Sequence, residues 1–255
     1  SNALLPDVIA MTITVIRDTV VCLDENNNPL RDIILWLDKR SVDPNGAMPA
    51  KNMMVFKLAG MEPTAKVVYA ASAGNWIMRH EPEIWARTAK YVMLPTYLNY
   101  KLAGNLIDSA SNQIGHIPFD YKNRRWMKPG SLTRCFCDVP NEKLCDLVPS
   151  GTVIGTITDE VSALTGIPAG LPLISTGSDK GCETLGLAVV DSDKASISLG
   201  TTATIQFSTT QYVEPQQFLP AYPGVLNDHY NPEIEIYRGL WLLSWFVKEF
   251  GTADA

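Results

Sequence analysis

Residues 173–207 read LISTGSDKGCETLGLAVVDSDKASISLGTTATIQF, and they hold most of the information about architecture in this chain. The apolar run Leu173–Thr176 predicts a buried strand, and the glycines at 177 and 181 predict a tight turn after it. A helix is then expected over Cys182–Val189. A buried strand followed by a turn and a helix is typical of α/β folds.

Asp179 lies in this turn, at the carboxyl end of the predicted strand. Open α/β sheets bind ligands at that place, and the flanking glycines 177 and 181 would let a ligand approach the backbone closely. A carboxylate here can accept the proton of a substrate hydroxyl during phosphoryl transfer. It can equally cap the following helix, and the residues alone leave both interpretations open.

Two alternating strands are expected at 195–199 and 203–207, joined by Gly200, Thr201 and Thr202. A glycine and two hydroxyl residues at a strand turn can donate hydrogen bonds to a phosphate, or they can form a simple β-turn. The sequence contains neither a P-loop nor a Gly-x-Gly-x-x-Gly dinucleotide fingerprint.

Upstream of this region, β-branched residues predict strands over 7–16, 19–23 and 31–36, with an Asn-rich turn before the last of them. From residue 76 to 104 the apolar spacing changes to a helical period. The positions on one face of this predicted helix are Ile84, Trp85, Ala89, Val92 and Met93. Pro82 suits a first helical turn, Pro95 is expected to break the helix, and Gly104 is expected to cap a second one.

The composition excludes several classes of protein. Of 255 residues, 46% are hydrophobic, which is enough for one large or two ordinary domain cores. The net charge of −6 argues against a nucleic acid or an anionic membrane as the main partner, so a small solute is expected. Five scattered cysteines suit a reducing compartment, no metal site is expected, and the protein is predicted to be cytoplasmic.

The order of these elements resembles the FGGY family of carbohydrate kinases over nearly the whole chain. The segments that carry the resemblance are 19–24 with 34–40, 81–84 with 97–104, 108–111, and above all 177–180, 185–186 and 195–202. The resemblance implies an α/β, actin-like ATPase (ribonuclease H-like) fold. The opening residues Ser1-Asn2-Ala3 are expected to be an expression-tag scar (1–3). The resemblance divides the rest into an N-terminal lobe lacking its start (4–170) and the truncated start of a C-terminal lobe (171–255).

Carried over position by position, the resemblance implies ATP-dependent phosphorylation of a small sugar or polyol, of the ketose or pentulose kind. Asp179 would be the general base, and Gly200, Thr201 and Thr202 would face the phosphates of ATP, with Mg²⁺ held through phosphates and water. Arg17, Asp18 and Lys180 would contact the sugar. Apart from the resemblance, His116 has no partner at a recognisable spacing in the sequence, so it is expected to be a satisfied loop histidine.

Two departures from the family pattern are Ser178 and Lys180, which flank the carboxylate where relatives have a glycine and an amide. They support an alternative, a non-catalytic sugar-binding or interaction module with the same architecture. The family's first phosphate loop and its adenosine-binding region would lie outside residues 4–255. The chain alone is therefore expected to be inactive and, because truncation exposes apolar surface, to self-associate, with a homodimer as one expected state.

Overall fold

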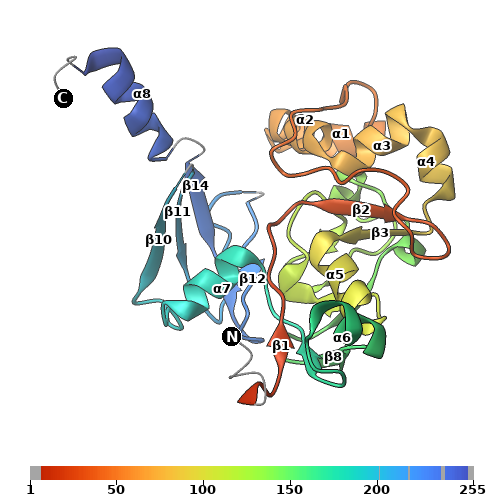
Figure 1. Ribbon diagram of the computed structural model, residues 1–255. Coiled ribbons are helices and arrows are strands. Elements are labelled where there is room, and N and C mark those ends of the chain that lie inside the picture. Colours follow the sequence, from red (N-terminus) through yellow and green to blue (C-terminus); the bar gives the residue numbers. More distant parts are fainter. Residues whose placement is uncertain (1–6, 201, 218, 237–238, 252–255) are drawn as a thin grey trace. The chain divides into compact units, whose positions relative to one another are not determined.

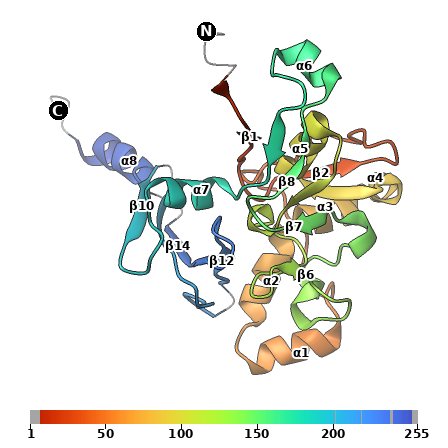
Figure 2. The ribbon, with the colours of Figure 1, turned by 90° about the horizontal axis from the view of Figure 1, so that it is seen from below.

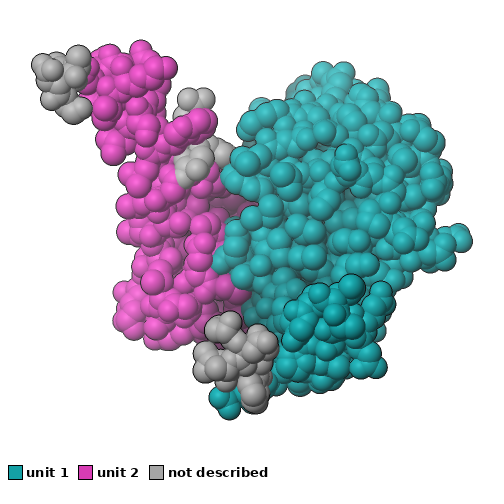
Figure 3. Space-filling model, viewed as in Figure 1, with its two compact units in different colours: residues 1–179 teal, residues 180–255 magenta. Residues whose placement is uncertain are grey.

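The computed structural model describes residues 7–200, 202–217, 219–236 and 239–251. The chain divides into two compact units, which we call unit 1 (residues 1–179) and unit 2 (residues 180–255), coloured separately in Figure 3. This division falls a short distance after the predicted one at 170/171, which remains a prediction.

Unit 1 mixes short strands with helices (Figure 1). Its α-helices are α1 (Ala50–Leu58), α2 (Glu62–Ala71), α3 (Ala73–His80), α4 (Pro82–Arg87), α5 (Leu94–Ala103) and α6 (Asp159–Thr165). Its strands are β1 (Met11–Thr12), β2 (Val20–Leu23), β3 (Lys90–Met93), β4 (Ile107–Ser109), β5 (Phe119–Asp120), β6 (Arg125–Trp126), β7 (Asp146–Val148), β8 (Val153–Thr156) and β9 (Pro172–Ile174). Short 3-10 helices lie at Ala110–Asn112 (η2), Leu132–Phe136 (η3) and Asn141–Lys143 (η4).

The core of unit 1 lies on both sides of the antiparallel pair β2–β3, in which Val20 is opposite Met93. Successive side chains of a strand point to opposite faces, so β2 supplies two clusters at once. Val20 and Cys22 pack with Ile77 and Phe119, whereas Val21 and Leu23 pack with Val92 and Cys145. This pair is therefore a central, doubly covered element of unit 1.

A second, mixed sheet has the order β1-β9-β8, with β1 and β9 parallel and β9 and β8 antiparallel. β4 and β7 form a further parallel pair. The carboxyl ends of β1, β4 and β9 lead into the segments that contain Arg17, His116 and Asp179. These three segments make up the candidate site.

Helix boundaries in unit 1 follow the capping signals. Thr158 accepts a hydrogen bond from the backbone of Val161 and starts α6, and Gly166 ends it in the left-handed conformation (φ 76°). Ser72 caps α3 in the same manner, and Gly104 ends α5 as predicted. Figure 2 shows α1 and α2 from below, and both helices contact η3.

Several predicted elements differ in the structure. Of the strand expected over 7–16, the structure has only β1, and the helix expected over 182–189 begins three residues earlier, at Asp179. The segment 31–36 forms no strand, and only a bridge between Ile34 and Val20 remains of it. Val92 and Met93 do not continue a helix, because they belong to β3, and Pro95 stands in the first turn of α5 instead of breaking a helix. A proline is well tolerated there because the first-turn N–H groups have no partner within the helix.

The described residues of unit 2 form the antiparallel sheet β10-β11-β14, the pair β12-β13, and the helices α7 and α8. Their bounds are α7 (Asp179–Gly186, whose first residue belongs to unit 1), β10 (Ala195–Leu199), β11 (Ala203–Phe207), β12 (Tyr222–Pro223), β13 (Tyr230–Asn231), β14 (Glu233–Ile236) and α8 (Trp241–Phe250). The hairpin β10–β11 has the bounds predicted from its alternation.

The β10-β11-β14 sheet buries polar side chains on one face and exposes apolar side chains on the other, the reverse of the usual arrangement. Its covered face contains Ser196, Thr204, Gln206 and Glu233. Gln206 receives a hydrogen bond from Thr184 of α7 and donates one of 2.6 Å to Glu233. The opposite face is apolar and exposed in the described part of unit 2. Its large side chains are Ile197, Leu199, Ile205, Ile234 and Ile236.

Candidate functional site

Three segments that lie far apart in the sequence meet in unit 1. They are residues 14–18 after β1, residues 109–116 from the end of β4, and residues 176–179 after β9. We call this set the three-segment cluster. Each segment follows a strand, and side chains at strand ends are where α/β folds place ligand contacts.

Hydrogen bonds join all three segments. The Thr14 hydroxyl donates to the carbonyl of Gly177 at 2.9 Å. The Ser109 hydroxyl donates to the carbonyl of Thr176, and the Ser178 N–H donates to the carbonyl of Ser111 at 3.1 Å. The backbone around Asp179 is therefore held from two sides by partners distant in sequence.

Within this cluster, Arg17 and Asp179 form an ion pair. The distance from Arg17 Nε to Asp179 Oδ1 is 3.4 Å, and the same nitrogen donates to Ser178 Oγ at 3.3 Å. The side chain of Asp179 is 32% exposed, so solvent or a ligand can reach it. Asp179 is also the first residue of α7 and does not lie in the preceding loop, and a carboxylate is favourable at that end of a helix.

Asp18 adopts a left-handed backbone conformation with φ 46°, which is uncommon for a residue with a side chain. Its N–H donates to the carbonyl of Ile114 at 3.0 Å. Gly115 packs directly against it: a Cβ at position 115 would lie 2.9 Å from the Cα of Asp18 and 2.8 Å from Met93. Sparsely populated backbone conformations that their surroundings enforce are concentrated at functional sites.

His116 holds the carboxylate of Asp18 through two hydrogen bonds. The backbone N–H of His116 donates to Oδ1 at 2.8 Å, and ring atom Nδ1 lies 2.6 Å from Oδ2. Burial lowers the pKa of His116, but the hydrogen bond and the charge of Asp18 act in the opposite direction and leave the pKa above its ordinary value. His116 is therefore a loop histidine whose ring Nδ1 is satisfied by Asp18, a partner that spacing in the sequence does not indicate.

A buried carboxyl group, Asp108, stands at the base of the same segment. It receives hydrogen bonds from Thr96 at 2.9 Å and from Asn112 and the Ser109 N–H at 2.8 Å each. Burial raises the pKa of Asp108 to about 6, and these hydrogen bonds oppose the rise. Asp108 is 0% exposed, which makes it a structural anchor of the turn into η2 and not a ligand contact.

The remaining predicted site residues lie in unit 2. Lys180 Nζ contacts Glu183 at 2.8 Å and the hydroxyl of Ser198 at 3.0 Å. Gly200 N–H donates to the carbonyl of Thr202 at 2.9 Å, and its own carbonyl accepts from Leu240. Thr201 lies outside the described residues. The roles of these four residues remain predictions.

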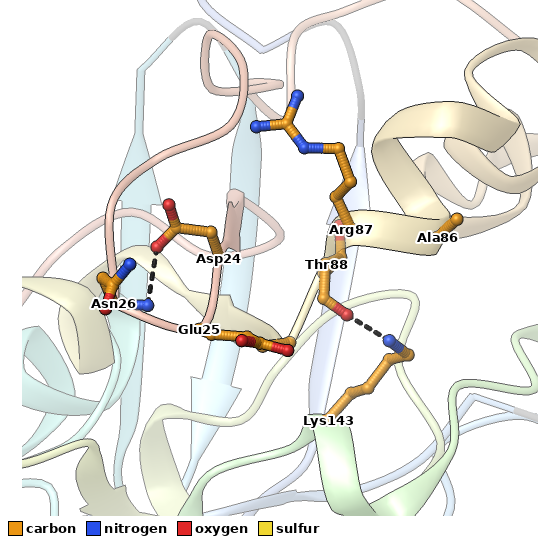
Figure 4. A pocket seen from close by; sticks show the side chains of 8 residues that line it. Asp24, Glu25, Asn26, Ala86, Arg87, Thr88 and Lys143 are labelled. Atoms are coloured by element: carbon orange, nitrogen blue, oxygen red, sulfur yellow. Dashed lines mark hydrogen bonds between the residues drawn. The ribbon is translucent and has the colours of Figure 1, made fainter.

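A polar hollow of about 480 Å³ lies elsewhere in unit 1, between the turn after β2 and the end of α4 (Figure 4). Asp24, Glu25, Arg87 and Lys143 line it, and none of them belongs to the three-segment cluster. In the described ranges, no group of three or more His, Cys, Asp or Glu side chains is arranged to hold a metal ion. None of the helices in those ranges combines the length and hydropathy of a membrane-crossing segment.

Sequence reasoning missed His116 as a member of the site. Its partner Asp18 lies 98 positions away in the sequence, so no local spacing could reveal the pair. One signal is present in the sequence: residues 108–126 are a long, irregular polar and aromatic stretch, and loops of that length are usually functional. This stretch supplies both the buried anchor Asp108 and the partly exposed His116.

Comparison with known proteins gives a consistent result. The sequence pattern described as "FGGY family of carbohydrate kinases, N-terminal domain" matches residues 2–186. The "Uncharacterized sugar kinase YgcE" of Escherichia coli (strain K12) is 33% identical over 158 residues, which are 62% of this chain and 32% of that protein. The xylulose kinase of the same organism is 27% identical over 254 residues, 98% of this chain and 51% of that protein.

Solved structures agree on the fold. A gluconate kinase and a ligand-bound xylulose kinase, both from Lactobacillus acidophilus, align with TM-scores of 0.77 and 0.76 at 20% identity, each over 96% of this chain and 49% of that chain. A Plasmodium falciparum glycerol kinase with ADP aligns with a TM-score of 0.72 at 17% identity, over 94% and 49%. The predicted actin-like fold is confirmed, and the chain spans about half the length of these kinases.

Proposed function

Because this chain belongs to the FGGY family of carbohydrate kinases, we propose that it forms part of an enzyme that phosphorylates a small sugar or polyol with ATP. The supporting observation is the position of Asp179 in the three-segment cluster. A half-exposed carboxylate, held at a helix start by contacts from two other segments, suits a group that must meet an alcohol in a fixed orientation.

In this proposal Asp179 accepts the proton of the acceptor hydroxyl. The oxygen of that hydroxyl forms a bond to the γ-phosphorus of ATP as the bond to the β–γ bridging oxygen breaks, and ADP leaves. Positioning and electrostatic stabilisation supply most of the acceleration in such transfers. Asp179 then has to orient one hydroxyl and remove one proton.

The acceptor is a ketose or polyol, and Arg17, Asp18 and Lys180 contact it. Similarity to proteins named xylulose and glycerol kinases supports this class, and the gluconate kinase among the solved structures adds a sugar acid to test. Charged hydrogen-bonding side chains recognise the several hydroxyl groups of such a molecule. We therefore choose D-xylulose, gluconate and glycerol as the acceptor panel for the experiments below.

ATP is the phosphoryl donor, with Gly200, Thr201 and Thr202 facing its phosphates. Mg²⁺ arrives as part of MgATP and is held mainly by phosphate oxygens and water, as is usual for this ion. We further propose a cytoplasmic location, where ATP is available, little or no turnover by residues 1–255 alone, and homodimer formation through exposed apolar surface.

The experiment compares wild-type protein with Asp179→Asn, a nearly isosteric change that removes the proton acceptor. In a longer protein that contains this sequence and phosphorylates a member of the acceptor panel, we expect a loss of at least 1,000-fold in kcat with a small change in acceptor affinity. An Asp179→Asn variant with a kcat within tenfold of wild type would rule out the role of general base.

A second candidate function is that of a sugar-binding module without kinase chemistry. The observation in its favour is the ion pair of Arg17 with Asp179, because a guanidinium on the carboxylate competes with an acceptor hydroxyl. Calorimetric titration with a nonhydrolysable ATP analogue separates the two functions. Sugar binding without any nucleotide binding by the longer protein would favour the module.

A further inference from the structure

The geometry of His116 indicates a role that the proposed kinase reaction does not yet use. An ionised carboxylate can only accept hydrogen bonds. Because Asp18 Oδ2 lies 2.6 Å from Nδ1 of His116, this nitrogen must carry a hydrogen. In neutral His116 the other ring nitrogen, Nε2, is then a bare hydrogen-bond acceptor.

Nε2 of His116 has no hydrogen-bond partner among the described residues. Nε2 is not one of the fully buried polar atoms without a partner, so it is accessible to solvent, and the His116 side chain as a whole is 30% exposed. A ligand can therefore reach this nitrogen. An accessible acceptor with a fixed orientation matches a hydroxyl group as its donor.

The ring has little freedom to turn away. The backbone N–H of His116 fixes the other oxygen of the same carboxylate, and Asp18 is itself fixed by the Ile114 carbonyl and by Gly115. A carboxylate on one nitrogen of an imidazole commonly sets both the tautomer and the direction of the other nitrogen. The pair Asp18–His116 has this arrangement.

The pair also belongs to the same site as Asp179. Arg17, the neighbour of Asp18, contacts Asp179, and Ser111 of the His116 segment accepts a hydrogen bond from the Ser178 backbone. Asp18 and His116 are thus connected to the Asp179 turn through both of their segments.

We propose that His116 binds a hydroxyl group of the acceptor through Nε2, and that Asp18 orients its ring for this contact. This inference rests on the proposed function and adds a second recognition residue to the acceptor site. When the pH is above the raised pKa of His116, so that the ring is neutral, it predicts a preference for acceptors with a neutral hydroxyl at this position, because the bare Nε2 accepts a hydrogen bond and repels an oxyanion.

The test uses three variants and the acceptor-panel member that wild-type protein binds most tightly, with calorimetry as the measurement. His116→Asn keeps a donor near the Nδ1 position, so Asp18 stays in place, but it has no atom at Nε2. His116→Ala removes both ring contacts, that of Nδ1 with Asp18 and the proposed one of Nε2 with the hydroxyl, and keeps the backbone hydrogen bond to Asp18. We expect each to raise the dissociation constant about tenfold, the effect of losing one hydrogen bond. His116→Gln, which can place an amide near the Nε2 position, is expected to recover part of the affinity.

His80→Asn is the matched control, since His80 stacks on Trp76, and no hydrogen bond or ion pair joins its side chain to the three-segment cluster in the described part of the chain. It should bind like wild type. A second measurement is the ¹⁵N resonance of His116 Nε2, which should lie in the unprotonated range at high pH and shift when the acceptor is added.

The outcomes separate the two proposals. Affinity retained by His116→Asn but lost in His116→Ala would overturn the hydroxyl contact and leave His116 with only a positioning role. Unchanged binding in every variant would overturn the inference entirely. A wild-type protein that binds no panel member would instead defeat the proposed function itself, whatever the variants do.

Discussion

Single residues determine how the candidate site is held together, and Gly115 is the most constrained of them. Its φ of 155° and its closeness to Asp18 and Met93 leave no space for a side chain. Asp18 in turn has a positive φ that few residues with a Cβ adopt. The restricted backbone of Asp18 and the missing space at Gly115 therefore meet at one contact between segments that are distant in the sequence.

Gly115→Ala should destabilise the protein by about 2 kcal/mol, because the added methyl forces the Asp18 backbone to move. Acceptor binding should weaken as well, since Asp18 and His116 would separate. Urea unfolding followed by tryptophan fluorescence measures the first effect.

The control for Gly115→Ala is Gly186→Ala in α7, where the added Cβ meets nothing within 4 Å. That variant should be neutral or slightly stabilising, because alanine favours a helix. Equal stability of the two variants would contradict the packing described at Gly115.

Sequence reasoning grouped Arg17, Asp18 and Asp179 only through a family resemblance, and the structure brings Arg17 and Asp179 within 3.4 Å. Their chemical roles remain predictions. The residues themselves could not have shown this grouping, because it depends on three strand ends meeting after the chain has folded. His116 lay beyond reach for the same reason.

At the level of secondary-structure elements, β4 and η2 depend on Asp108. Its carboxyl group gathers hydrogen bonds from α5 through Thr96 and from η2 through Asn112. The parallel pair β4–β7 and the turn that leads to His116 are thereby tied to the core.

Asp108 should make stability depend on pH. Its folded pKa of about 6 exceeds the ordinary value of 3.8, so the folded state holds the proton more tightly than the unfolded state. The stabilisation from this group is complete below pH 3.8 and is lost as the pH rises through about 6. Relative to Asp108→Asn, wild-type stability should fall by roughly 3 kcal/mol across this window.

Thr96→Val tests the direction of this effect. The Thr96 hydroxyl lowers the pKa of Asp108, so its removal should raise the pKa further and move the pH midpoint of the loss upward. Unfolding free energies at half-unit steps between pH 4 and 8 would show both shifts. A wild-type curve parallel to that of Asp108→Asn would contradict the prediction.

Elements with strong local signals can be predicted from the sequence, and elements decided by tertiary packing cannot. The hairpin β10–β11 has alternating polar and apolar residues, and the helix α6 has Thr158 and Gly166 as its caps, so each sequence is compatible with one element type. Ala89–Met93 had helical spacing, but Val92 pairs with Val21 of β2 in the core, and strand pairing overrides a short periodic signal. The sequence predicts a helix end at Pro95, because a proline in the first turn of a helix cannot be distinguished by sequence alone from a proline that ends one.

For the molecule as a whole, unit 2 has an unusual distribution of polarity. Its sheet buries hydroxyl, amide and carboxyl groups and exposes isoleucine and leucine. Helix α8 exposes apolar side chains over most of its surface, and Ser244 and Lys248 lie together on the remaining side. An exposed apolar surface of this extent is typical of a helix that is covered by other protein. Its exposed apolar residues are Trp241, Leu242, Leu243, Trp245, Phe246, Val247 and Phe250.

We expect residues 1–255 to self-associate through the exposed sheet face. Ile197, Ile205 and Ile234 are cross-strand neighbours that form one apolar row. Replacing all three by threonine keeps the preference for a strand and removes roughly 1 kcal/mol of apolar burial at each position. The association constant from sedimentation velocity should therefore fall at least tenfold.

Leu164→Thr on α6 is the control for this prediction. Leu164 is 79% exposed and is not one of the residues of the apolar sheet row, so its replacement should leave association through that row unchanged. Association that persists in the triple variant would point to another surface, of which α8 is the obvious candidate.

The boundary between the two units has a practical consequence for deletion studies. Asp179 closes unit 1, yet the rest of α7 belongs to unit 2. Cutting the gene at the apparent border would leave Asp179 as the last residue and give it a second negative charge from the new terminus. The first turn of its helix would be lost as well. A dissection that keeps residues through Gly186 would preserve the local environment of the carboxylate that it sets out to study.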